Sequence, residues 1–145
     1  MFTQLALATI AVTLIGLIHL VGLALLTRVL RSHHQLFRSF RIMPPTLLLM
    51  ATLGIIAIHT IEIWSFALLY VRLHAFAAIE PALYFSTTTY ASIGYGDIVM
   101  PHQWRILGAI EGAAGTIMLG WSTAYLVSLL VRLRAFGHDW LSAEH

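Results

Sequence analysis

The 145-residue chain contains no cysteine, which excludes a disulfide framework and any metal site built on thiolates. Lysine is also absent, and charged residues make up only 10% of the sequence, against about 25% in a typical soluble domain. The net charge of +2 is too small to indicate a nucleic-acid partner. No nucleophile and base are arranged as in an enzyme, and no histidine or carboxylate cluster has the spacing of a metal site. We therefore expect neither catalysis nor a cofactor.

Long apolar runs dominate the sequence instead. Hydrophobic residues make up 59% of the chain, and the mean hydropathy is +0.86. A helix that spans a bilayer needs about 20 apolar residues, and three runs are long enough, at about 5–26, 46–71 and 103–133. The first run has no basic segment before it and is long for the apolar part of a signal peptide, so we predict a retained helix. The sequence predicts an all-α membrane protein with three transmembrane helices.

A fourth apolar run, at 81–91, is too short to cross a membrane. Pro81 suits the first position of a helix, and Glu80 before it complements the positive end of the helix dipole. The run leads directly into residues 92–97, which hold two glycines and an aspartate. We predict a short helix that enters the membrane and stops, followed by an extended segment.

The arginines predict how the helices are oriented. The loop after the first helix carries four of them, Arg28, Arg31, Arg38 and Arg41. Two more follow the third helix, whereas the connection between the second and third helices has only two. By the positive-inside rule, the first loop and the C-terminus are cytoplasmic, and the N-terminus lies outside the cell membrane. The four arginines are either ordinary flanking charges or a surface for anionic lipid headgroups.

These predictions divide the chain into three parts. Residues 1–45 would form an N-terminal helix and a basic cytoplasmic loop, 46–133 a second module, and 134–145 a short cytoplasmic tail. Within the second module we expect helices at 46–71, 81–91 and 103–133, with the extended segment 92–97 between the last two.

The extended segment at 92–97 has the composition of an ion-coordinating strand. Backbone carbonyls that all turn to one side replace the water shell of a cation, and this requires some residues with φ above zero. Gly94 and Gly96 adopt such conformations at little cost. Ser92 offers a hydroxyl oxygen, and Asp97 is placed to anchor the strand at its outer end. One strand does not enclose an ion, so a symmetric homo-oligomer is expected.

The motif T-Y-A-S-I-G-Y-G-D at residues 89–97 resembles the potassium-channel filter, commonly T-x-x-T-V-G-Y-G-D. The segment P-A-L-Y-F-S before it matches the pore-helix pattern of that family, and Trp104 follows the filter as a tryptophan often does there. The resemblance covers about residues 46–133 and implies a homotetramer that conducts K⁺. By position it assigns K⁺ coordination to Ser92, Ile93, Gly94 and Tyr95. It assigns filter support to Gly96, Asp97, Tyr84, Thr88 and Thr89.

Three departures from the family pattern bear on function. Ser92 replaces the usual threonine, Ala91 stands where many members have another threonine, and Thr88 stands where some members have a carboxylate. The innermost ion site is therefore expected to be looser. A less selective monovalent cation channel, or a non-conducting membrane subunit, is the alternative to a K⁺-selective channel.

Two further groups of residues have two interpretations each. Gly112 and Gly115, with Gly108, share one face of the third helix, and either allow close helix packing or include a gating hinge. His59, Glu62 and Glu111 are ionisable residues within apolar helices, and form either a buried polar brace or a proton-sensitive one. His19 stands alone on the first helix, and we expect it to form a hydrogen bond between helices rather than to bind a ligand.

Overall fold

The structure of the chain, a computed structural model, describes residues 2–37 and 43–136, and within them every regular element is a helix. The helices in chain order are α1 (Phe2–Phe37), α2 (Met43–Arg72), α3 (Ile79–Tyr90), the 3₁₀ turn η1 (His102–Trp104) and α4 (Arg105–Phe136). The short helix α3 and the residues up to η1 occupy the part of the chain for which the sequence predicts a short helix and an extended segment.

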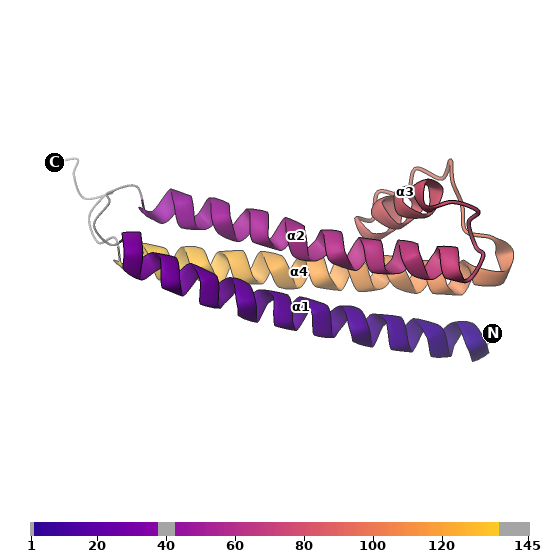
Figure 1. Cartoon of the computed structure of the whole chain (residues 1–145), viewed down its shortest axis with the longest axis horizontal. Coiled ribbons are helices and arrows are strands. Elements are labelled where there is room, and N and C mark those ends of the chain that lie inside the picture. Colours follow the sequence, from indigo (N-terminus) through magenta and orange to yellow (C-terminus); the bar gives the residue numbers. More distant parts are fainter. Residues whose placement is uncertain (1, 38–42, 137–145) are drawn as a thin grey trace.

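Three long helices lie side by side, and α3 sits against α2 and α4 at the end where the chain begins (Figure 1). The helices α1, α2 and α4 alternate in direction, so the chain passes along the bundle three times. Each is long and apolar enough to cross a membrane, over Phe2–Ser32, Pro45–Arg72 and His102–Leu133. The prediction of an all-α protein with three transmembrane helices is confirmed, and the chain is a multi-pass membrane protein.

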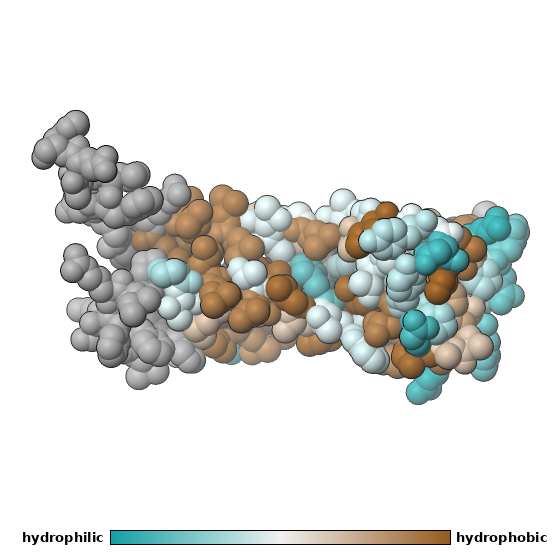
Figure 2. All heavy atoms as spheres, turned by 90° about the horizontal axis from the view of Figure 1, so that it is seen from above, coloured by the Kyte–Doolittle hydropathy of each residue, from teal (hydrophilic) through white to brown (hydrophobic). Residues whose placement is uncertain are grey.

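Apolar side chains cover much of the outside of the bundle. Large exposed ones include Leu17 and Leu20 on α1, Leu53 and Ile56 on α2, and Ile117 on α4. Brown apolar atoms cover much of the middle of the bundle, whereas white and teal polar atoms gather toward the α3 end (Figure 2). In water this surface would be costly, but lipid chains are as apolar as these side chains.

The first helix is longer than its apolar run. It continues as helix to Phe37, so Arg28 and Arg31 lie exposed on α1 and not in a loop. The extension has a packing reason, because Leu30 is buried against Leu47 and other apolar side chains of α2 and α4. No glycine or proline interrupts this stretch. Arg38 and Arg41 lie outside the described residues.

Proline sits inside the first turn of two helices. Pro44 and Pro45 follow the first residue of α2, and Pro81 is the third residue of α3, so the prediction that Pro81 opens the helix is wrong by two positions. A first-turn N–H has no partner within the helix, so proline loses nothing there. Glu80 lies in the first turn of α3, where a negative charge is favourable.

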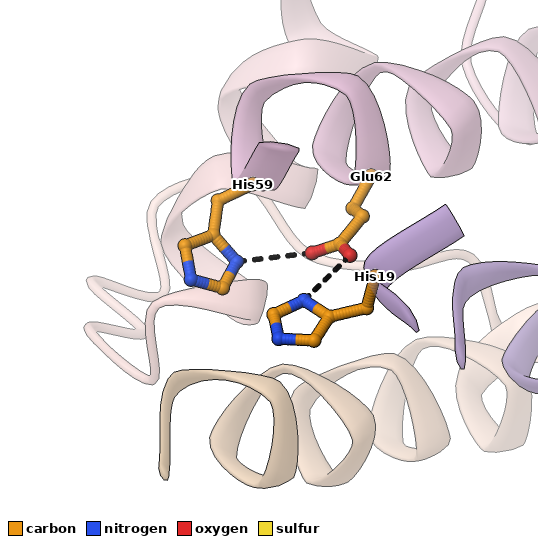
Figure 3. A group of neighbouring side chains, drawn as sticks. All are labelled: His19, His59 and Glu62. Atoms are coloured by element: carbon orange, nitrogen blue, oxygen red, sulfur yellow. Dashed lines mark hydrogen bonds and ion pairs between the residues drawn. The ribbon is translucent and has the colours of Figure 1, made fainter. Parts of the chain in front are cut away.

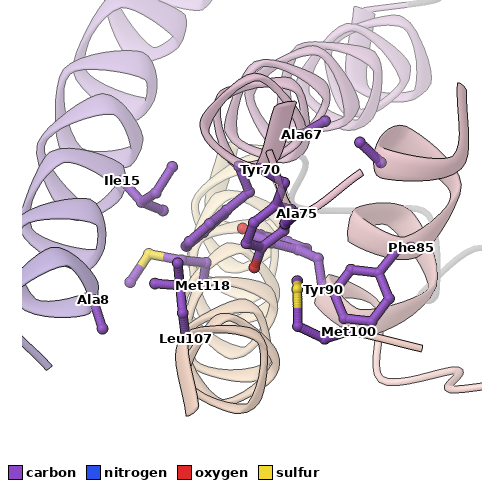
Figure 4. Close-up of a cluster of buried hydrophobic side chains, with 12 residues drawn as sticks. Ala8, Ile15, Ala67, Tyr70, Ala75, Phe85, Tyr90, Met100, Leu107 and Met118 are labelled. Carbon is purple, nitrogen blue, oxygen red and sulfur yellow. The ribbon is translucent and has the colours of Figure 1, made fainter. Parts of the chain in front are cut away.

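The main core reaches from α1, between α2 and α4, to α3 (Figure 4). Its largest side chains are aromatic, and the rings of Tyr70 and Phe85 meet edge to face with centroids 5.7 Å apart. From α4, Leu107 and Met118 complete this core, and Ile15 joins it from α1. The core therefore fixes α3, and with it the segment that follows α3, to the rest of the chain.

Candidate functional site

The filter segment, residues 92–97, begins two residues after α3 ends at Tyr90. Ser92, Gly94 and Gly96 have φ angles of +57°, +59° and +80°. The residues between them have no positive φ, so the sign of φ alternates along the strand. The two glycines adopt the region expected of them, whereas the positive φ of Ser92 was not predicted from its residue type.

Backbone hydrogen bonds fix the start of the filter segment to the last turn of α3. The carbonyl of Thr88 accepts from the N–H groups of Ile93 and Gly94, at 2.8 and 3.1 Å. The carbonyl of Thr89 accepts from the N–H of Ser92 at 3.0 Å. Both threonines thus support the strand through backbone atoms that any residue has, which sequence reasoning does not detect.

The side chain of Ser92 is also held in place. Its hydroxyl oxygen lies 2.9 Å from that of Thr116 on α4, and Thr116 in turn donates to the carbonyl of Gly112 at 3.0 Å. Both side chains are exposed in the single chain. Thr116 was missed in the sequence because no motif includes it. The link connects α4 directly to the start of the filter segment.

The outer end of the filter segment is tied to α3. The hydroxyl of Tyr84 donates to Asp97 Oδ2 at 2.8 Å. This hydrogen bond holds the pKa of Asp97 below its usual value, so the carboxylate stays charged at neutral pH. The structure brings together two residues that the sequence assigns to filter support.

Residues 46–132 match the profile of a family described as ion channel. The match covers more than half of the chain and includes α3, the filter segment and the α2 and α4 helices around them. The chain belongs to the ion channel family. No curated protein and no solved structure matches it. Helix α1 of the channel precedes the matched residues.

The channel has a buried carboxylate, Glu111, between α4 and α3. Its two oxygens accept hydrogen bonds from Tyr70, at 2.5 Å, and from Ser86. Ser86 also lies 3.0 Å from the carbonyl of Ile63 on α2. These contacts link α4 to α2 and to Ser86, which lies within α3 and not at its end. Glu111 therefore anchors the middle of α3.

A second carboxylate, Glu62 on α2, has other partners. Its oxygens face His59 and His19, whose Nδ1 atoms lie 3.0 and 2.9 Å away (Figure 3). Tyr90, the last residue of α3, also donates to Glu62. The single brace of His59, Glu62 and Glu111 that the sequence suggests is thus two separate clusters, because Glu111 faces Tyr70 and Ser86 instead.

No histidine and carboxylate cluster has metal-site spacing in the sequence, but the fold brings His19, His59 and Glu62 together. His19 is 40 residues from His59 in sequence, and only the packing of α1 on α2 brings the two rings to a centroid distance of 5.4 Å. The expectation that His19 forms a hydrogen bond between helices is confirmed by its contact with Glu62.

The glycines of α4 face the pore helix. A Cβ on Gly115 would lie 2.2 Å from the carbonyl oxygen of Tyr90, and one on Gly108 would lie 3.2 Å from the Phe85 ring. A Cβ on Gly112 would make an ordinary contact, 3.4 Å from the carbonyl of Thr89. Close packing thus accounts for Gly115 and Gly108, and the hinge interpretation of Gly112 and Gly115 stays a prediction.

Proposed function

We propose that the chain forms a K⁺-selective channel of four identical copies, with a filter built from the carbonyls of Ser92, Ile93, Gly94 and Tyr95. The observation that carries the proposal is the alternating backbone of residues 92–97. An ordinary strand points successive carbonyls to opposite sides, whereas alternating left-handed and right-handed residues turn them to the same side. A row of carbonyls then takes the place of water around a cation.

The exposure of the filter segment supports assembly into a ring. Every residue from Ala91 to Asp97 is exposed in the single chain, and the side chains of Ile93 and Tyr95 are 50% and 71% exposed. Irregular backbone at membrane depth is tolerated only where protein buries it or it lines a watery cavity. Neighbouring copies would bury the outer side of each strand and leave its carbonyls around a common axis.

Helix α3 favours a cation near the inner end of the proposed filter. It ends at Tyr90, so its free carbonyl groups lie directly before Ser92. The C-terminus of a helix carries roughly −0.5 elementary charge, and four such ends around an axis would attract a monovalent cation. The hydroxyl groups of Ser92 and Thr116, which contact each other, lie at this same end of the proposed filter.

Ion flux through liposomes tests the proposed function. Vesicles that contain the purified protein should release K⁺ down its gradient, and an imposed Na⁺ gradient should give at least tenfold slower flux. Equal K⁺ and Na⁺ flux would support the less selective cation channel, which the smaller side chain of Ser92 favours. No flux of either ion would support the non-conducting subunit. Empty vesicles are the control.

The number of copies is tested separately. Mass measurement of the protein in detergent or nanodiscs should give four chains, because the carbonyls of one strand leave most of an ion uncoordinated. A conducting monomer or dimer would contradict the proposed ring.

We also propose that the C-terminus and the Arg28–Arg31 end of α1 face the cytoplasm, where Arg28 and Arg31 contact anionic headgroups. Single cysteines at Ser39 and Ser142 should resist an impermeant thiol reagent added outside intact cells, whereas a cysteine at the exposed Ala77 should react. The chain has no native cysteine to confuse the result. If the reagent added outside labels the cysteines at positions 39 and 142 but not the one at 77, the chain has the opposite orientation and the proposal is wrong.

A further inference from the structure

Three side chains with metal-ligand atoms meet inside the bundle. His19 comes from α1, and His59 and Glu62 come from α2, each near the middle of its membrane span (Figure 3). One ligand atom from each residue can be chosen so that all three lie within 4.8 Å of one another. His19 and Glu62 are fully buried, and His59 keeps 9% of its surface exposed. The cluster is therefore buried, and only His59 is partly accessible from the surface of the chain.

The ligand atoms of this cluster suit a cation. The two imidazoles and the carboxyl group of Glu62 offer nitrogen and oxygen lone pairs in an apolar part of the bundle. The polar partners of Glu62 are His19, His59 and Tyr90, and none of them brings a permanent positive charge. An uncompensated charge inside a membrane is costly.

Ser122 on α4 faces the opposite edges of both rings. Its hydroxyl oxygen lies 3.4 Å from His19 Nε2 and 3.0 Å from His59 Nε2. If both neutral rings donate a hydrogen bond from Nδ1 to Glu62, both Nε2 atoms are acceptors and each needs a donor. The Ser122 hydroxyl has only one proton, so one of the two Nε2 atoms is left without a hydrogen bond from it. If both Nδ1 atoms instead bind a metal ion, each Nε2 carries a proton, and the two lone pairs of the Ser122 oxygen accept from both. The position of Ser122 fits the metal-bound form of the two rings.

We propose that His19, His59 and Glu62 bind one Zn²⁺ ion through the two Nδ1 atoms and the carboxylate. Two imidazoles and a carboxylate are a ligand set that Zn²⁺ accepts, whereas Ca²⁺ and Mg²⁺ prefer oxygen ligands. Zinc bonds of about 2.0–2.2 Å place tetrahedral ligand atoms about 3.3 Å apart. His19 Nδ1 lies 2.9 Å from one oxygen of Glu62, and His59 Nδ1 lies 3.0 Å from the other, so both nitrogens already face the carboxyl group that would share the ion with them.

Tyr90 lies beside the proposed ligands. Its phenol oxygen lies 3.0 Å from His59 Nδ1 and is hydrogen-bonded to Glu62. Because Tyr90 ends α3, the bound ion joins α1 and α2 to the pore helix two residues before Ser92. The site includes α1, which lies outside the residues that match the ion channel family, and it does not depend on which ion the channel conducts.

Calorimetric titration of the full chain with Zn²⁺ tests the site. The protein is purified in detergent without a histidine tag and freed of metal with a chelator. Wild type should bind one Zn²⁺ per chain at the cluster, and the double variant His19→Gln/His59→Gln should lose that binding. The matched control is His33→Gln/His34→Gln, which removes two histidines elsewhere on α1 and should keep it. Equal binding by the two double variants, or none by wild type, would overturn the proposal.

Two measurements serve if the double variant does not fold. X-ray absorption of the wild-type protein with one equivalent of Zn²⁺ should give two imidazole nitrogens and oxygen ligands at about 2.0–2.2 Å. An oxygen-only shell, or one with three or more imidazoles, would place the ion elsewhere and overturn the site. Ser122→Ala should weaken Zn²⁺ binding roughly 10- to 100-fold, as loss of such outer partners does, whereas the exposed Ser128→Ala should not. Equal affinity of these two variants would contradict the role of Ser122.

Discussion

Gly94→Ala should abolish K⁺ flux while leaving the protein inserted in the membrane. Gly94 has a φ of +59°, and an L-residue with a side chain is disfavoured there by about 1–2 kcal/mol. In a ring of four copies the cost adds to about 4–8 kcal/mol, which lowers the fraction of intact filters by about a thousandfold or more. Space within one chain is not the obstacle, because a Cβ on Gly94 meets no atom within 4 Å.

The measurement is K⁺ flux in liposomes with the amount of inserted protein determined in parallel. Gly16→Ala is the matched control, since a Cβ there also meets nothing within 4 Å and Gly16 lies in the helix α1 without a positive φ. That variant should conduct like wild type. Unchanged flux and selectivity in Gly94→Ala would refute the proposed filter, because the alternating backbone could then not be what coordinates the ion.

The parts of this molecule that follow from local sequence were predictable. Hydrophobic length gives the three spans, and glycine at 94 and 96 gives the positive φ angles, because both depend on single residues or short runs. The positive φ of Ser92 was not predictable from residue type. It follows from the backbone bonds between Thr88, Thr89 and residues 92–94, and from the hydroxyl contact with Thr116.

The buried clusters show the limit of sequence reasoning more clearly. The spacing of His59 and Glu62 placed them on one face of a helix, but nothing local indicated that His19 would join them from α1 or Ser122 from α4. Likewise Glu111 was known to lie in an apolar helix, but its partners Tyr70 and Ser86 come from two other elements. Such partners depend on how helices rotate and slide against each other, which apolar periodicity leaves open when a helix is apolar on all sides.

Gly115 is where α4 comes closest to the end of the pore helix. A Cβ at this position would lie 2.2 Å from the carbonyl oxygen of Tyr90 and 2.9 Å from its C and Cα atoms. These are backbone atoms, so no side-chain rotation relieves the contact and α3 must move away from α4. Tyr90 precedes the filter segment and binds Glu62, so a shift here disturbs the filter and the histidine cluster together.

Gly115→Ala should therefore lower both K⁺ flux and the stability of the solubilised protein. Overpacking of this kind costs about 1–3 kcal/mol per chain in the free energy of unfolding, or more where backbone must move. Thermal unfolding in detergent and flux in liposomes give the two readouts. Gly120→Ala on the same helix is the matched control, since its Cβ would meet nothing within 4 Å, and alanine in a helix is about 1 kcal/mol better than glycine.

Gly112→Ala separates close packing from a gating hinge. A Cβ at Gly112 would lie 3.4 Å from the carbonyl of Thr89, an ordinary contact that leaves the packing intact. If α4 bends at Gly112, the alanine should change the flux without lowering the unfolding temperature, because a hinge depends on backbone freedom and not on space. If Gly115 acts through packing, only Gly115→Ala should lower that temperature. A Gly115→Ala protein as stable as Gly120→Ala but altered in flux would instead assign the hinge to Gly115.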